Sequence, residues 1–128
     1  MAWEMSSKGF LMTLSGYVPD LIKEDFKGLA LQGLHAAGLQ QKDITHWCIH
    51  PGGKKILEAI EKSMNLQHEE LKYSYDVLNH FGNMSSATIL FVLKKILDEV
   101  ILSLSPAKIF GAAFGPGLTM ETFTATYD

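Results

Sequence analysis

The sequence predicts an α/β domain with three layers, in which a mixed β-sheet carries helices on both faces. Apolar stretches that suit strands alternate with stretches of helical periodicity, and the chain closes with two strands in succession. Apolar residues make up 47% and charged residues 20% of the chain, as in a globular protein with its own core. A chain of 128 residues removes roughly two thirds of its unfolded surface from water, so we expect one domain over residues 1–128.

The first half of the chain predicts strand, helix, strand and helix in turn. Gly9 to Val18 alternates moderately and a proline closes it, which is typical of a strand followed by a break. Leu21 to Gly38 places its apolar residues mostly on one side at helical spacing. Thr45 to Ile49 favours a strand that ends at His50. The helix that follows is predicted from an apolar stripe of Ile56, Leu57, Ile60 and Met64.

The second half predicts a long helix and a hairpin. A long helix is predicted over Met84 to Leu104, and because its first half, Ala87 to Leu93, is apolar all round, we expect it to run through the middle of the molecule. Ala107 to Phe114 and Leu118 to Tyr127 are predicted strands, and the short link between them suits an antiparallel hairpin. The segment before the long helix is interpreted as a turn at Gly82. Met1 to Lys8 start abruptly, as in a chain cut from something longer.

Composition and charge exclude several classes of function. The net charge is -3 and the 11 basic residues are scattered, so nucleic acid is not an expected partner. The longest apolar runs, such as Ala87 to Leu93, are much shorter than the roughly 20 residues that span a bilayer, and no secretion signal is present. We therefore expect a cytoplasmic protein without a membrane segment. Its one cysteine, Cys48, excludes an intrachain disulfide, and the dispersed histidines predict no metal site.

Three features stand at the ends of predicted elements. His50 ends a strand, Asn83 precedes the long helix, and Gly115 to Gly117 join the last two strands. In α/β sheets, ligands bind at the loops beyond the strand ends. Each feature also has an ordinary explanation, because a lone histidine is usually a surface or core residue, an asparagine before a helix is usually a cap, and Gly-Pro-Gly is usually a tight turn. Taken singly, none of them identifies a function.

The three features belong to motifs that occur in one order: HPGG from His50, GNMSSA from Gly82 and FGPGLTMET from Phe114. Together these motifs resemble the C-terminal half of the type III polyketide synthases, the chalcone and stilbene synthase family. The resemblance continues in MAW and GFLMTLSGYVP near the N-terminus and covers essentially the whole chain. It implies one half of a thiolase-like fold.

The resemblance implies a decarboxylative condensation of an acyl-CoA starter with malonyl-CoA, with these thioesters as substrates and no cofactor. His50 and Asn83 match the family residues that donate hydrogen bonds to the thioester oxygen as it becomes negative. One such donor is worth about 10²- to 10³-fold in rate. The matching CoA-binding positions are Leu14, Gly52, Gly53 and Lys55. The matching product-pocket positions are Trp3, Met12, Ser85, Gly115 and Pro116.

The family's nucleophilic cysteine belongs to the N-terminal half, which we expect to lie outside this chain. Cys48 is no substitute, because its position matches an apolar strand residue in relatives. We therefore expect the N-terminal half as a partner, no condensing activity in the isolated chain, and self-association, in the family's dimer mode or a substitute for it, through the long apolar helix. Two alternatives stay open: a condensing enzyme like ketoacyl synthase III, and a non-catalytic dimerisation module with the same fold.

Overall fold

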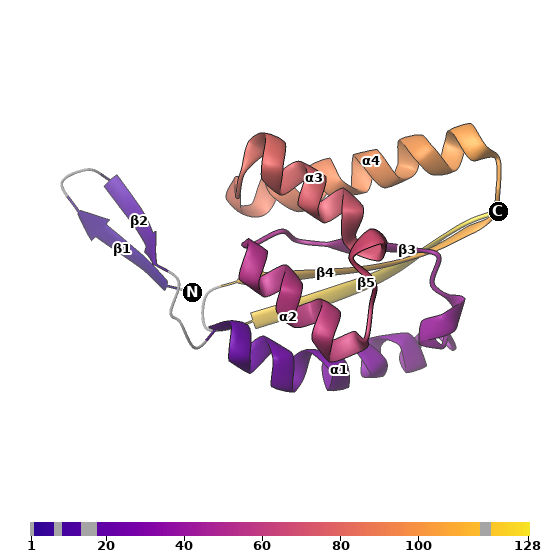
Figure 1. Cartoon of the computed structure of the whole chain (residues 1–128), viewed down its shortest axis with the longest axis horizontal. Coiled ribbons are helices and arrows are strands. Elements are labelled where there is room, and N and C mark those ends of the chain that lie inside the picture. Colours follow the sequence, from indigo (N-terminus) through magenta and orange to yellow (C-terminus); the bar gives the residue numbers. More distant parts are fainter. Residues whose placement is uncertain (1, 7–8, 14–17, 116–118) are drawn as a thin grey trace.

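Three strands and four helices form a three-layer body in the structure, a computed structural model that describes residues 2–6, 9–13, 18–115 and 119–128 (Figure 1). Its strands are β3 (His46–Ile49), β4 (Ala107–Gly115) and β5 (Thr119–Tyr127). They lie in the order β3-β4-β5, with β3 parallel and β5 antiparallel to β4. The predicted mixed sheet and its closing hairpin are therefore confirmed.

Helices cover both faces of the sheet, as the sequence predicts. These helices are α1 (Val18–Ala36), α2 (Lys54–Met64), α3 (Lys72–Phe81) and α4 (Thr88–Ser103). In Figure 1, α1 and α2 lie on one side of the strands and α4 lies on the other. Strand alternation divides the core in the same way, because Trp47 and Ile49 pack with α1 and α2, whereas Cys48 packs beneath α4.

The face beneath α1 and α2 holds the larger part of the core. The Trp47 indole meets the Phe110 ring edge-on, with ring centroids 5.5 Å apart. The predicted stripe of α2 is buried against these rings, and burial of each large aliphatic side chain contributes about 1.5–3 kcal/mol. The outer side of α2 is polar, with Lys54, Lys55 and Lys62 exposed. α2 therefore has the ordinary pattern of a helix at a protein surface.

α4 has one buried row and one exposed apolar row. Every fourth residue from its first position is buried against the sheet: Thr88, Val92, Ile96 and Val100. The exposed apolar residues on its outer side are Leu90, Phe91, Leu97, Ile101 and Leu102. Among the residues that the structure describes, nothing covers that side. The expectation that this helix runs through the middle is therefore wrong for this chain, in which α4 is an outer layer.

The turn predicted at Gly82 is confirmed, but the residues before it, for which no helix was predicted, form α3. α3 lies between the two parts of the core, so Tyr75 packs on the α2 side and Val77 on the α4 side. Apolar residues nevertheless recur at helical spacing here, because Leu71, Tyr75 and Leu78 pack in the same part of the core, so the sequence held a signal for α3 that was missed. The turn itself is real, since Gly82 has φ of 72°.

The strand predicted over Gly9 to Val18 ends at Thr13 and does not belong to the three-stranded sheet. β2 (Gly9–Thr13) pairs antiparallel with β1 (Ala2–Ser6), which the sequence analysis did not predict. The two form a sheet of their own, which stands apart from the three-layer body in Figure 1. Val18 begins α1 rather than ending a strand.

Candidate functional site

His50 follows the last residue of β3 and is nearly buried, with 5% of its surface exposed. Its backbone N–H donates to the Ala112 carbonyl at 2.9 Å, which extends the pairing of β3 with β4 by one residue. The Ser74 hydroxyl on α3 donates to the Ile49 carbonyl at 2.6 Å. The backbone on both sides of the His50 peptide nitrogen is therefore fixed, by the sheet and by α3.

Asn83 lies in the loop that Gly82 opens between α3 and α4. Its Oδ1 accepts the Ser85 N–H at 2.9 Å, and its Nδ2 donates to the Gly52 carbonyl at 3.3 Å. A donor on one side and an acceptor on the other assign the orientation of the amide. The NH₂ group carries two hydrogens. One N–H donates to the Gly52 carbonyl, so the second is free to donate to a further acceptor.

Gly52 is the residue at which His50 and Asn83 meet. A Cβ placed on Gly52 would lie 3.7 Å from Cδ2 and 3.9 Å from Nε2 of the His50 ring, so the imidazole lies beside this glycine. The Asn83 amide bonds the carbonyl of the same glycine. The structure therefore brings the two expected oxyanion donors to one place, and their catalytic role stays a prediction.

Burial sets the protonation of His50 and Cys48. Desolvation lowers the pKa of His50 from its ordinary 6.5, because the imidazolium loses hydration there. At neutral pH the ring is uncharged and has one N–H donor. Desolvation raises the pKa of the Cys48 thiol to about 12, so the nucleophilic thiolate does not form at neutral pH. This agrees with the expectation that Cys48 is not the nucleophile.

The predicted CoA-binding residues Gly52, Gly53 and Lys55 lie between His50 and the first turn of α2. The Gly52 N–H bonds the His50 carbonyl at 2.9 Å, which makes a tight turn across the intervening proline. A Cβ on Gly53 would meet no atom within 4 Å, so this residue borders open space. Lys55 is exposed. The open space in this turn therefore lies at Gly53, whereas Gly52 is packed against Ile56 and the His50 ring.

Two predicted pocket residues lie in the three-layer body. Ser85 is adjacent to Asn83 through the hydrogen bond from its N–H. Gly115 ends β4 opposite Thr119, at the start of the closing hairpin turn. Only Ser85 is thus linked by a described contact to the site.

The other predicted pocket and CoA residues lie either in the β1–β2 hairpin or outside the described residues. Trp3 and Met12 are direct cross-strand partners in the β1–β2 hairpin, which stands apart from the main sheet in Figure 1. Their pairing places both residues at one level of that hairpin. Leu14 and Pro116 lie outside the described residues.

Two hydroxyls near the site were not predicted from the sequence. Among the side chains that the structure describes, the buried polar ones are His50, Ser74 and Thr88. Ser74 bonds the peptide before His50, and Thr88 bonds the backbone that follows Asn83. The sequence holds a signal that Thr88 is buried, because Thr88 stands four residues before Val92 and so begins the periodic row of α4 that faces the sheet.

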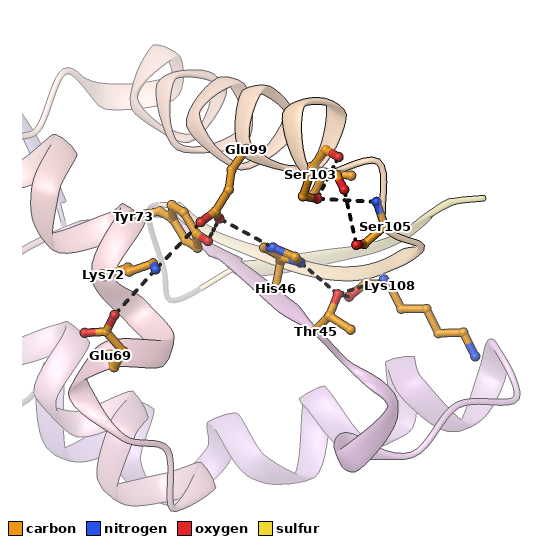
Figure 2. Close-up of polar contacts among 10 residues, drawn as sticks. Thr45, His46, Glu69, Lys72, Tyr73, Glu99, Ser103, Ser105 and Lys108 are labelled. Carbon is orange, nitrogen blue, oxygen red and sulfur yellow. Dashed lines mark hydrogen bonds and ion pairs between the residues drawn. The ribbon is translucent and has the colours of Figure 1, made fainter.

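A second polar cluster lies toward the opposite end of β3 (Figure 2). Glu99 on α4 accepts the Tyr73 hydroxyl and lies 3.6 Å from Nε2 of His46 and 3.8 Å from Nζ of Lys72. Thr45 hydrogen-bonds His46 at 2.7 Å and also bonds the start of β4. These contacts join α3, α4 and β3, so the cluster holds the layers together.

A groove of about 560 Å³ lies between α3 and α4. Its lining residues are Lys72, Tyr73, Asp76, Lys95, Asp98 and Glu99. Lys95 pairs with Asp76 at 2.5 Å, and Lys72 pairs with Glu99 at 3.8 Å. Because both lysines are paired with carboxylates, the groove offers no net cation for the phosphates of CoA.

In the described part of the chain, no three His, Cys, Asp or Glu side chains converge as the ligands of a metal ion would. None of the described helices combines the length and the hydropathy that crossing a bilayer requires.

Comparisons with known proteins give one consistent result. The sequence model of the C-terminal domain of chalcone and stilbene synthases matches residues 1–126. A putative chalcone synthase from Bacillus subtilis (strain 168) is 34% identical over 128 residues, which is 100% of this chain and 35% of that protein. The alpha-pyrone synthesis polyketide synthase-like Pks18 from Mycobacterium tuberculosis (strain CDC 1551 / Oshkosh) is 35% identical over 117 residues, which is 91% of this chain and 30% of that protein.

A solved structure extends the comparison to the fold. The crystal structure of PKS-I from the brown alga Ectocarpus siliculosus matches with a TM-score of 0.87 and 28% identity, over 96% of this chain and 34% of that chain. The predicted thiolase-like fold is therefore confirmed. The chain spans about a third of the length of these relatives.

Proposed function

Because the chain belongs to the chalcone and stilbene synthase family, as a C-terminal domain, we propose that it supplies the oxyanion donors of a type III polyketide synthase. The proposed reaction is the decarboxylative condensation of an acyl-CoA starter with malonyl-CoA, without a cofactor. The observation that carries the proposal is the meeting of His50 and Asn83 at Gly52. Two N–H donors from separate loops can then bind one thioester oxygen, whose negative charge develops in the transition state.

His50 and Asn83 supply their hydrogen bonds in complementary ways. A neutral imidazole donates one N–H without carrying a charge that the buried site would have to solvate. A carboxamide donates at every pH, because it does not titrate. The Asn83 amide is fixed before substrate arrives, through Ser85 and Gly52, and the sheet holds the backbone that carries the buried His50 ring. Such preorganisation is what makes an oxyanion hole effective.

The open space beside Gly53 supports the proposed path for the substrate. We place the CoA arm along the turn after His50, where a glycine backbone permits close approach. Leu14, Gly52, Gly53 and Lys55 are the residues assigned to it. The acyl chain extends past Ser85, and its pocket is completed by Trp3, Met12, Gly115 and Pro116.

The nucleophile is assigned to another part of the whole enzyme. Cys48 is buried beneath α4 and keeps its proton, which supports this assignment. The N-terminal half of the synthase is the proposed partner, and the exposed apolar row of α4 is where it packs. A homodimer in the cytoplasm is the proposed assembly.

A chimera tests the catalytic proposal. This chain replaces the matching third of the Bacillus subtilis relative, which aligns with all 128 residues. Condensation of acyl-CoA with malonyl-CoA is then followed by mass spectrometry of the products. We expect an active chimera in which His50→Gln and Asn83→Leu each lower kcat about 10²- to 10³-fold, since each variant removes one oxyanion donor.

Matched controls separate chemistry from folding. His35→Gln changes an exposed histidine on α1, and Asn79→Leu changes an exposed asparagine on α3. Both controls keep the activity of the parent chimera. An active chimera that tolerates His50→Gln and Asn83→Leu contradicts the proposed roles and favours a non-catalytic assembly module.

The isolated chain tests the assignment of the nucleophile. Incubated with acyl-CoA and malonyl-CoA, the purified chain gives no condensation product. Product formation would overturn the assignment, because Cys48 would then be the only thiol available. Binding is measured separately, by titrating CoA into the ¹⁵N-labelled chain, and the amide shifts concentrate at Gly52, Gly53 and Lys55.

A further inference from the structure

Thr88 is a polar residue in an otherwise apolar row. It begins α4 and is fully buried, in line with Val92, Ile96 and Val100. A valine at this position would continue the row without the cost of burying a hydroxyl, which is substantial unless the group is hydrogen-bonded. The partners of the hydroxyl therefore show what this residue holds.

The Thr88 hydroxyl hydrogen-bonds the backbone of both residues that follow Asn83. Its Oγ1 accepts the Met84 N–H at 2.7 Å and donates to the Ser85 carbonyl at 2.8 Å. Ser85 has φ of 63°, a left-handed value that residues other than glycine adopt at a cost. One buried oxygen thus holds the peptide groups on both sides of a strained turn.

The strained turn directs the Asn83 side chain. With Ser85 in the left-handed conformation, its N–H lies 2.9 Å from Oδ1 of Asn83. Because a carboxamide is planar, fixing Oδ1 also fixes the direction of the N–H bonds. Nδ2 then lies 3.3 Å from the Gly52 carbonyl, beside the His50 ring.

We propose that Thr88 is a positioning residue, which sets the direction of the Asn83 amide through the backbone of Met84 and Ser85. It touches neither substrate nor the reacting atoms. Its consequence for condensation rests on the proposed function. The direction of the amide, in contrast, is a property of this chain and is measured without any reaction.

The competing explanation is that Thr88 only caps a helix. A cap satisfies free backbone groups at a helix start, and its loss lowers the stability of that helix alone. A positioning residue must also change Asn83, which lies outside the helix. The two explanations therefore differ in one spectroscopic signature.

The experiment is NMR on the full ¹⁵N-labelled chain with assigned Asn83 side-chain amide and Ser85 backbone amide resonances. Thr88→Val removes the hydroxyl, and Thr88→Ser keeps it. Ser103→Ala is the matched control, because Ser103 on the same helix donates its hydroxyl to the carbonyl three residues earlier, at 3.0 Å. Thr88 makes the same bond to Ser85.

We expect Thr88→Val to shift both resonances and to speed hydrogen exchange of the Ser85 amide about three- to tenfold, the equivalent of one lost hydrogen bond. Thr88→Ser restores the wild-type spectrum, and Ser103→Ala leaves it unchanged. An unchanged Asn83 amide in folded Thr88→Val overturns the proposal.

A measurement on the wild-type chain covers the case in which Thr88→Val does not fold. A buried, doubly bonded hydroxyl exchanges slowly, so its proton is observable with a contact to the Met84 amide proton. A hydroxyl that exchanges at the rate of an exposed threonine overturns the proposal. A failure of the proposed function has a different signature. In that case CoA leaves the amide resonances of Gly52 to Lys55 unchanged, while Thr88→Val still shifts the Asn83 amide resonance.

Discussion

The two helical layers of this domain differ in the polarity of their outer surfaces: the outer surface is polar on α2 and largely apolar on α4. α2 buries its apolar stripe and presents lysines such as Lys54 and Lys62 on the other side. α4 buries one row and presents a second apolar row, in which Leu90 is 63% and Ile101 is 52% exposed. Phe81 and Phe91 extend this surface, with ring centroids 5.2 Å apart. α1 also exposes two apolar side chains, Leu29 and Leu31, among its described residues.

The difference shows that a helix can serve two interfaces at once. The inner row of α4 stabilises this domain, whereas its outer row contributes little until another surface covers it. The α1–α2 layer needs no such cover. We therefore expect substitutions on the two rows of α4 to have separable effects.

The largest expected effect distinguishes buried rows from the exposed one. Ile60→Ala on α2 and Ile96→Ala on α4 remove fully buried side chains, so each lowers the free energy of unfolding by about 2–5 kcal/mol. Ile101→Ala on the outer row of α4 changes it by less than about 0.5 kcal/mol. Urea denaturation at low protein concentration measures all three. A loss at Ile101 as large as that at Ile96 would mean that the outer row is already covered.

Self-association tests the outer row directly. Leu97→Glu combined with Ile101→Glu places charges on the exposed side of α4 and should weaken self-association more than about tenfold, since burial of one such side chain is worth about 1.5–3 kcal/mol. Sedimentation velocity across a dilution series measures the change. Leu29→Glu with Leu31→Glu on α1 is the matched control. Equal weakening by both pairs would remove the distinction between the layers.

Neighbouring residues report separately on the two faces of the sheet. Trp47 faces α1 and α2, while Cys48 lies beneath α4 and its thiol pKa is raised to about 12 by burial. We expect Cys48 to resist thiol reagents in the native chain and to react at lower urea than the Trp47 fluorescence transition, because the α4 face has the smaller core. Trp3→Phe removes the second indole from the signal. Coincident transitions would show that the layers unfold together.

The sequence was sufficient for elements whose apolar residues share one stripe or one strand face. The stripe of α2, the hairpin of β4 and β5, and the position of His50 at a strand end are confirmed. α3 was missed although Leu71, Tyr75 and Leu78 stand at helical spacing, since it has only ten residues and no side-chain cap marks its start. The apolar pattern of α4 was misjudged for a different reason. Periodicity shows that two sides of a helix are apolar, but it does not show which side packs against the sheet and which stays exposed.

The candidate site divides in the same way. Motif resemblance selected His50 and Asn83, yet their meeting at Gly52 depends on how two loops approach in space. No local pattern encodes that approach. The left-handed φ of Ser85 is held by local partners instead, Asn83 and Thr88, which stand two and three residues away, but serine itself has no preference for this conformation.

The smallest expected effect is a dependence of stability on pH that belongs to His50 rather than to either helical layer. Burial holds the pKa of His50 below 6.5 in the folded chain, whereas the unfolded chain keeps about 6.5. Between these two values the unfolded chain binds more protons, so stability rises with pH. The stability that His50 contributes is therefore complete above pH 6.5 and is lost as the pH falls toward the folded pKa.

The difference between wild type and His50→Gln isolates this contribution from that of the other histidines. Urea denaturation at a series of pH values from 7.5 to 5 should show the wild type losing stability relative to the variant as the pH falls. His35→Gln, on the exposed side of α1, should follow the wild type. A constant difference between wild type and His50→Gln would mean that the imidazole is as well hydrated in the folded chain as in the unfolded one. It would then lack the dry surroundings that a strong oxyanion donor requires.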